Sequence, residues 1–209
     1  MIIISHRGMW AREGEKNHPI SFAQSFKSGF GTETDVRDFA GELVISHDAP
    51  TVLGLSFKSF LEIYKDNGAK HPLALNIKSD GLQNQLVPLM REISPEHWFV
   101  FDMSVPDALG WIRLGAPTFT RQSEYELSPP YYTEAVGVWL DSFHSDWWSE
   151  EVISRHLDAG KKVCVVSPEL HKRDPRTVWE RMAKRFIEEK RVILCTDFPE
   201  QAKDYFRNG

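Results

Sequence analysis

Two histidines, two carboxylates and an arginine near the start of the chain have the types and spacing needed to cleave a phosphodiester. His6 and Arg7 end a short apolar run, Glu33 and Asp35 are separated by one residue, and His47 follows them. Two imidazoles can carry protons near neutral pH. Two carboxylates suit a hard cation such as Mg²⁺ or Ca²⁺, and a planar guanidinium suits phosphate oxygens.

The carboxylate pair falls inside a predicted strand over Thr32–Arg37. Side chains at i and i+2 of a strand share a face, so Glu33 and Asp35 should point in the same direction. Two such carboxylates repel unless a cation lies between them. The alternative is a solvated pair on an edge strand, but the apolar neighbours and the nearby histidines favour a metal site.

A hairpin is predicted to bring the second histidine to the first. The turn Ala40-Gly41-Glu42 is followed by a strand-like stretch, Leu43–Ser46, which folds back on the preceding strand and ends before His47. This would place His47 at the same end of the sheet as His6. Asp48 either orients His47 or caps the turn.

Eight apolar runs have the length and composition of parallel strands buried on both faces. They are Ile2–Ser5, Thr32–Arg37, Leu73–Lys78, Trp98–Asp102, Pro117–Thr120, Val136–Asp141, Lys162–Val166 and Arg191–Cys195. Helices are predicted over Phe22–Ser28, Gly81–Glu92, Val105–Leu114, Trp147–Ala159 and Arg176–Lys190. Ser21 is the expected cap of the first of these helices, and Asp146 of the fourth.

A glycine stands between a helix-like segment and the next strand at four places, Gly29, Gly68, Gly115 and Gly160. Repeated helix-glycine-strand units indicate parallel α/β architecture. With eight strands, we expect a (β/α)8 TIM barrel, with a short hairpin extending the second strand. No linker or composition break divides the chain, so one domain over residues 1–209 is expected. A doubly wound open sheet is the competing fold.

Polar residues recur where these strands end. They include His6, Arg7, Asp35, Asn76, Lys78, Asp102, Arg121, Asp141, Ser167 and Asp197. In a barrel these ends converge on one mouth, where active sites form. Any one of them could instead cap a helix, but a His-Arg pair or Asn-x-Lys is an unusual cap. Lys78 would add a charge on a phosphate. Trp139 is the best aromatic candidate for lining a substrate pocket, and Asp197 is a second pocket-lining candidate.

Composition limits the function further. The chain has 209 residues, 41% hydrophobic and 26% charged, and a net charge of −5 argues against general nucleic-acid binding. No apolar run reaches the ~20 residues that span a bilayer, so no stable membrane insertion is expected. Cys164 and Cys195 lie in apolar runs and are interpreted as free buried thiols, which fits a reducing compartment. His6 leaves no room for a targeting peptide before it. Together these two features predict a cytoplasmic protein.

Taken together, these motifs resemble the glycerophosphodiester phosphodiesterase family. The matching segments are His6-Arg7-Gly8, Asn17 before the first helix, Glu33-Thr34-Asp35-Val36, Gly41 with His47-Asp48, and Thr196-Asp197-Phe198-Pro199. The resemblance implies a (β/α)8 barrel, a divalent metal, and cleavage of glycerophosphodiesters to glycerol phosphate and an alcohol in lipid metabolism.

Carried over residue by residue, the resemblance makes His6 and His47 the acid-base pair, Glu33 and Asp35 metal ligands, and Arg7 and Lys78 phosphate contacts. The chain departs from the family's pattern at three places. Where the family has Glu-x-Lys on the third strand, this chain has Asn76-Ile77-Lys78; an amide oxygen can ligate but brings no charge, so weaker metal binding is expected. Lys16 replaces a glutamate before Asn17, and Val163–Ser167 lacks the family's tryptophan.

The resulting hypothesis is a metal-assisted hydrolase of a small-molecule phosphodiester. One histidine would deprotonate a substrate hydroxyl and the other would protonate the leaving alcohol, and attack by a neighbouring hydroxyl would give a cyclic phosphate that water could open. Two alternatives stay open. One is a phospholipase-type enzyme that acts on another head group and stops at the cyclic product. The other is a non-catalytic ligand-binding barrel with a weakened metal site at Asn76.

Overall fold

The computed structural model describes residues 1–67 and 70–208, and the expected Gly68 boundary lies outside them. Parallel strands form at all eight predicted places. They are β1 (Ile2–His6), β2 (Gly31–Phe39), β4 (Leu73–Ile77), β5 (Trp98–Phe101), β6 (Phe119–Gln122), β7 (Gly137–Leu140), β8 (Lys162–Val166) and β9 (Val192–Thr196). The hairpin strand β3 (Glu42–Ile45) pairs antiparallel with β2, as predicted.

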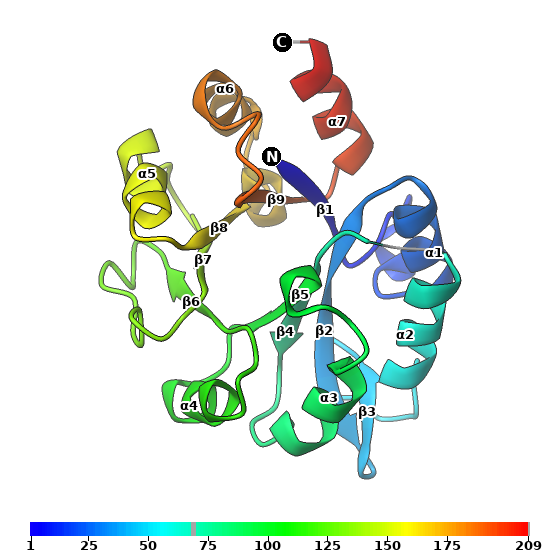
Figure 1. Ribbon diagram of the computed structural model, residues 1–209. Coiled ribbons are helices and arrows are strands. Elements are labelled where there is room, and N and C mark those ends of the chain that lie inside the picture. Colours follow the sequence, from blue (N-terminus) through cyan, green and yellow to red (C-terminus); the bar gives the residue numbers. More distant parts are fainter. Residues whose placement is uncertain (68–69, 209) are drawn as a thin grey trace.

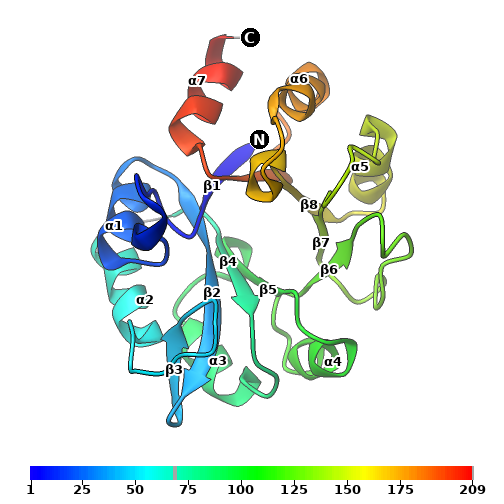
Figure 2. The same ribbon diagram turned by 180° about the vertical axis from the view of Figure 1, so that it is seen from behind.

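The helices ring the outside of these strands, as Figures 1 and 2 show from opposite sides. They are α1 (Pro19–Lys27), α2 (Phe57–Asp66), α3 (Gln83–Met90), α4 (Val105–Arg113), α5 (Glu150–Asp158), α6 (Arg176–Arg185) and α7 (Pro199–Asn208). Three short 3₁₀ segments of the described chain lie in connections between strands and helices: η1 (Glu13–Glu15), η2 (Pro95–His97) and η3 (Pro168–His171).

Two predicted helix caps are wrong. His18, and not Ser21, precedes α1, since its ring accepts the Ile20 amide and Pro19 starts the helix with its fixed φ. Asp146 caps nothing; it pairs with Arg173, and α5 starts after Ser149. The helix α7 was not predicted, because its start, Pro199, directly follows the polar strand end and the segment has few apolar residues.

The strands close into a barrel whose order is β5-β4-β2-β1-β9-β8-β7-β6. A single parallel bridge, Val100 to Thr118, joins the two ends of that order, and the Val100 amide donates to the Pro117 carbonyl at 2.9 Å. The (β/α)8 barrel is therefore confirmed and the open doubly wound sheet is wrong.

Every second residue of a strand points into the barrel, and most of these inward side chains are apolar. A polar layer lies above them, toward the carboxyl ends of the strands. The inward residues include Ile4, Ala74, Phe99, Phe101, Phe119, Trp139, Cys164, Ile193 and Cys195, which form one buried cluster. Phe99 stacks on Phe119 with ring centroids 3.8 Å apart. Outward-facing residues pack against the helices in two further clusters. Cys164 and Cys195 are free and buried, as predicted.

The next inward positions along the strands are polar. His6 follows Ile4, Asn76 follows Ala74, and Asp197 follows Cys195, each two residues further toward the carboxyl end of its strand. The alternation that builds the apolar core therefore also delivers polar side chains to one mouth of the barrel.

Candidate active site at the barrel mouth

His6 ends β1 and pairs in register with Glu33 of β2. Its Nδ1 lies 2.7 Å from Oδ1 of Asp197, and its Nε2 lies 3.9 Å from Oε2 of Glu33. Burial lowers the pKa of His6, and the Asp197 carboxylate opposes that effect. When Nδ1–H donates to Asp197, the neutral ring presents its Nε2 lone pair to the mouth.

Glu33 and Asp35 share the inward face of β2 and are almost completely buried, at 2% and 0% exposed. Asn76 of β4 is the register partner of Asp35. Burial, and next the Asp35 charge, raise the pKa of Glu33 to about 8. Two buried carboxylates this close need a compensating positive charge. The solvated edge-strand alternative for this pair is therefore wrong.

Three buried oxygens at this place have no hydrogen-bond donor: Oε2 of Glu33, Oδ1 of Asp35 and Oδ1 of Asn76. Buried acceptors are normally satisfied, so a cluster of free ones requires an explanation. A hard cation takes such carboxylate and amide oxygens as ligands, so these residues fit a divalent metal. Among the described residues, no group of three or more His, Cys, Asp or Glu side chains is arranged to hold a metal ion by itself.

Two cations and an amide surround Asp35. The Arg7 Nε lies 2.8 Å from Oδ2, as an ion pair without hydrogen-bond alignment, and Lys78 Nζ lies 3.6 Å from Oδ1. Asn17 donates from Nδ2 to the same Oδ2 at 2.9 Å and accepts from Thr34 through its Oδ1. The structure thus brings Arg7 and Lys78, both proposed from sequence as phosphate contacts, to the carboxylate pair.

Arg7 and Asn17 both have positive φ, 59° and 58°. A positive φ is uncommon outside glycine, and residues that adopt it are found mainly at functional sites. The Asn17 amide donates to the Arg7 carbonyl at 2.9 Å, so the two strained residues hold each other. The sequence marks Asn17 only through the resemblance, since spacing alone does not predict this contact.

A second ionic network extends the mouth to β5 and β6. Asp102 follows β5 with φ 72° and accepts from Nη1 of Arg121 at 2.5 Å. Glu126 pairs with Nε of the same guanidinium, and Lys78 lies 3.6 Å from Oδ2 of Asp102. Lys78 is therefore shared between Asp35 and Asp102.

His47 lies two residues beyond β3. The Ser46 amide donates to the Asp35 carbonyl at 3.1 Å, so the hairpin carries His47 back to the level of the carboxylate pair. Its Nδ1 lies 2.8 Å from Oδ1 of Asp48, and the ring is about half exposed. Both candidate proton carriers therefore have a carboxylate partner on Nδ1, with His6 buried and His47 open to solvent.

Trp139 lies in the apolar cluster inside the barrel. Its ring is buried, 5% exposed, and stacks on Phe101 with centroids 3.8 Å apart inside the barrel. The aromatic ring proposed as a pocket lining is thus part of the apolar layer below the mouth. Asp197, expected only to line a pocket, is the hydrogen-bond partner of His6 and also borders a cavity of about 290 Å³ with Trp10 and Phe198.

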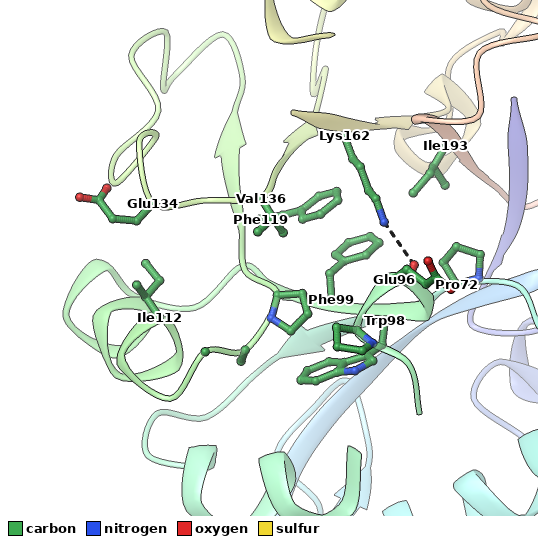
Figure 3. A pocket seen from close by; sticks show the side chains of 14 residues that line it. Pro72, Glu96, Trp98, Phe99, Ile112, Phe119, Glu134, Val136, Lys162 and Ile193 are labelled. Carbon is green, nitrogen blue, oxygen red and sulfur yellow. Dashed lines mark hydrogen bonds between the residues drawn. The ribbon is translucent and has the colours of Figure 1, made fainter. Parts of the chain in front are cut away.

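A further cavity, about 420 Å³, lies at the other end of the barrel. It is lined where strands begin, by Trp98, Phe119, Val136 and Lys162 among others. Figure 3 shows apolar side chains around it and the Lys162 ammonium pointing to Glu96, whose carbonyl accepts at 3.2 Å. Barrel enzymes place chemistry at the carboxyl ends of strands, so we assign no catalytic role to this cavity.

Stability should depend on pH through His156, a buried histidine outside the candidate site. Its ring is buried between Tyr132 and Gln122, each at 2.8 Å, and burial lowers its pKa from 6.5 to about 4. As pH falls below 6.5, the unfolded chain therefore binds the proton before the folded protein does. The contribution of His156 to the free energy of unfolding is complete above pH 6.5 and is lost toward pH 4. Urea unfolding at pH 7 and pH 4 should show a loss about 1–3 kcal/mol larger in wild type than in His156→Gln. Equal losses would contradict the assignment.

Of the comparisons with known proteins, only the one with solved structures finds similar proteins. No protein-family model matches the chain, and no curated protein sequence matches it. Among solved structures, a glycerophosphodiester phosphodiesterase from Parabacteroides distasonis has a TM-score of 0.71 and 18% identity, covering 99% of this chain and 97% of that one. A glycerophosphodiester phosphodiesterase from Agrobacterium tumefaciens has 0.73 and 17%, covering 100% of both.

A more distant structure is also similar. It is a Ca²⁺-dependent phosphatidylinositol-specific phospholipase C from Streptomyces antibioticus, with a TM-score of 0.51, 9% identity, and coverage of 98% of this chain and 95% of that one. The fold that the resemblance in the sequence implied is therefore the fold of solved structures with the same family name. In the described residues no helix has the length and apolar character to cross a membrane.

Proposed function

We propose that this chain is a divalent-metal-assisted phosphoric diester hydrolase that cleaves a glycerophosphodiester to a phosphomonoester and an alcohol. The observation that carries the proposal is the set of three buried oxygens of Glu33, Asp35 and Asn76 that have no hydrogen-bond donor and lie beside His6. A proton carrier next to a cation site at a barrel mouth is the arrangement that this reaction needs. The solved structures of the same fold with that activity in their names support it.

Different residues would bind the cation and the phosphate. Glu33, Asp35 and Asn76 would hold Mg²⁺ or Ca²⁺, which when bound supplies charge stabilisation to a phosphoryl oxygen. Arg7 and Lys78 lie beside Asp35, where their charges attract the phosphate and stabilise its developing negative charge.

His6 and His47 would move the protons. Asp197 holds Nδ1 of His6 and Asp48 holds Nδ1 of His47, so each ring offers Nε2 for proton transfer. One ring takes the proton from the attacking hydroxyl, and the other gives a proton to the leaving alcohol. If the attacking hydroxyl belongs to the substrate, a cyclic phosphate forms first and water opens it.

The test follows ³¹P NMR spectra of glycerophosphodiesters incubated with the purified chain and Mg²⁺ or Ca²⁺. A phosphomonoester should accumulate, a chelator should stop the reaction, and added cation should restore it. Accumulation of a cyclic phosphate alone would instead favour the phospholipase-type reaction. No cleavage with either cation would favour the ligand-binding barrel and contradict the proposal.

A further inference from the structure

Glu169 is a half-buried carboxylate on η3, the turn that follows β8. Its Oε1 accepts the backbone amide of Asp197 at 3.1 Å and the hydroxyl of Thr196. Its Oε2 accepts the hydroxyl of Ser167, whose oxygen in turn accepts from the indole of Trp179 at 2.9 Å. Burial raises the pKa of Glu169, and these hydroxyl donors act against that rise. The carboxylate therefore ties the end of β9 to the end of β8.

The sheet does not hold Asp197 by itself. The parallel ladder between β1 and β9 ends at the pair Ser5 and Thr196, one residue before His6 and Asp197. The helix α7 begins two residues later at Pro199, which has no amide hydrogen to donate. The Asp197 amide thus goes to Glu169, while its side chain goes to His6 at 2.7 Å.

We propose that Glu169 is a positioning residue that fixes the Asp197 backbone, so that the Asp197 carboxylate holds His6 in its Nδ1-protonated form. The kinetic part of this inference rests on the proposed function. Glu169 acts only through Asp197, as outer-sphere partners of catalytic groups do. Spacing in the sequence does not predict this role, because Asp197 is 28 residues from Glu169 and only the fold brings the two together.

The test compares Glu169→Ala, Glu169→Gln and wild type in diester cleavage. Glu169→Ala should lower kcat about 10- to 100-fold and change KM less than about twofold. Glu169→Gln keeps an oxygen for Thr196 and Asp197, so its kcat should stay within about threefold of wild type. The ¹⁵N NMR spectrum of the neutral His6 ring should show one tautomer in wild type and a mixture in Glu169→Ala.

Asp107 supplies a matched control. Like Glu169, it is a carboxylate that accepts a backbone amide, here from Gly81 at 2.8 Å. It also accepts the indole of Trp111 directly, at 2.9 Å, and it lies on α4. Asp107→Ala should lose stability as Glu169→Ala does, yet keep the His6 tautomer and show no comparable fall in kcat.

The outcomes separate the two claims. Full kcat in Glu169→Ala, or an equal loss in Asp107→Ala, would overturn the positioning role. If wild type cleaves no diester, the proposed function fails and the ¹⁵N spectrum alone decides on Glu169. An unchanged His6 tautomer in Glu169→Ala then overturns the inference, and a mixture upholds the structural part of it.

Discussion

Replacing His6 with alanine should lower kcat for diester cleavage at least about 100-fold, which is the usual contribution of a positioned proton carrier. The buried imidazole lies between Asp197 and Glu33, and alanine removes the ring nitrogen that would carry the proton. The measurement is the initial rate at saturating substrate and cation, together with the urea midpoint to show that the variant is folded.

His97→Ala is the control for this substitution. His97 ends η2 at the amino end of β5, so it lies at the opposite end of the barrel from His6 and should leave kcat unchanged. Full activity in a folded His6→Ala variant would rule out His6 as a proton carrier. Equal losses in both variants would show that the effect is not specific to the mouth.

Replacing Asn76 with glutamate should tighten divalent-cation binding by about 10- to 100-fold, because a charged oxygen replaces an uncharged one. Asn76 is in register with Asp35, and its Oδ1 has no hydrogen-bond donor. A third carboxylate should also destabilise the metal-free protein by repulsion, and the cation should restore that stability. Isothermal titration calorimetry with Mg²⁺ and Ca²⁺ measures the first effect, and thermal unfolding with and without cation measures the second.

Two further variants make this result interpretable. Asn76→Asp has the size of asparagine with the charge of glutamate, so it should also tighten binding, whereas Asn76→Gln adds length without charge and should not. If neither acidic variant binds the cation more tightly while both remain folded, position 76 does not face the metal.

Much of the fold could be predicted because barrel strands are buried on both faces and therefore appear as apolar runs. The run over Lys162–Val166 was predicted with its correct ends. The helix starts were harder, because Ser21 and Asp146 are common cap types whose side chains make other contacts here. Ser21 donates to the Glu15 carbonyl at 2.8 Å, and Asp146 pairs with Arg173.

The part of the site that could be predicted is local in sequence. Glu33 and Asp35 share a face because a strand alternates, and the hairpin turn places His47 beside the same strand. The partners of these residues come from far along the chain. Asp197 is 191 residues from His6, and only the closed barrel brings the two together. Trp139 was also proposed for the site, but it points into the barrel one layer below the mouth and belongs to the apolar core.

The most direct test of the central claim is a crystal of this protein soaked with Mn²⁺ and glycerol phosphate, with anomalous scattering used to locate the cation. We expect one peak at oxygen-ligand distance, about 2.0–2.6 Å, from the carboxylates of Glu33 and Asp35, with the phosphate of the ligand beside Arg7 and Lys78. A fully ordered mouth with no cation peak at millimolar Mn²⁺ would contradict the metal-assisted mechanism and leave these carboxylates a structural role.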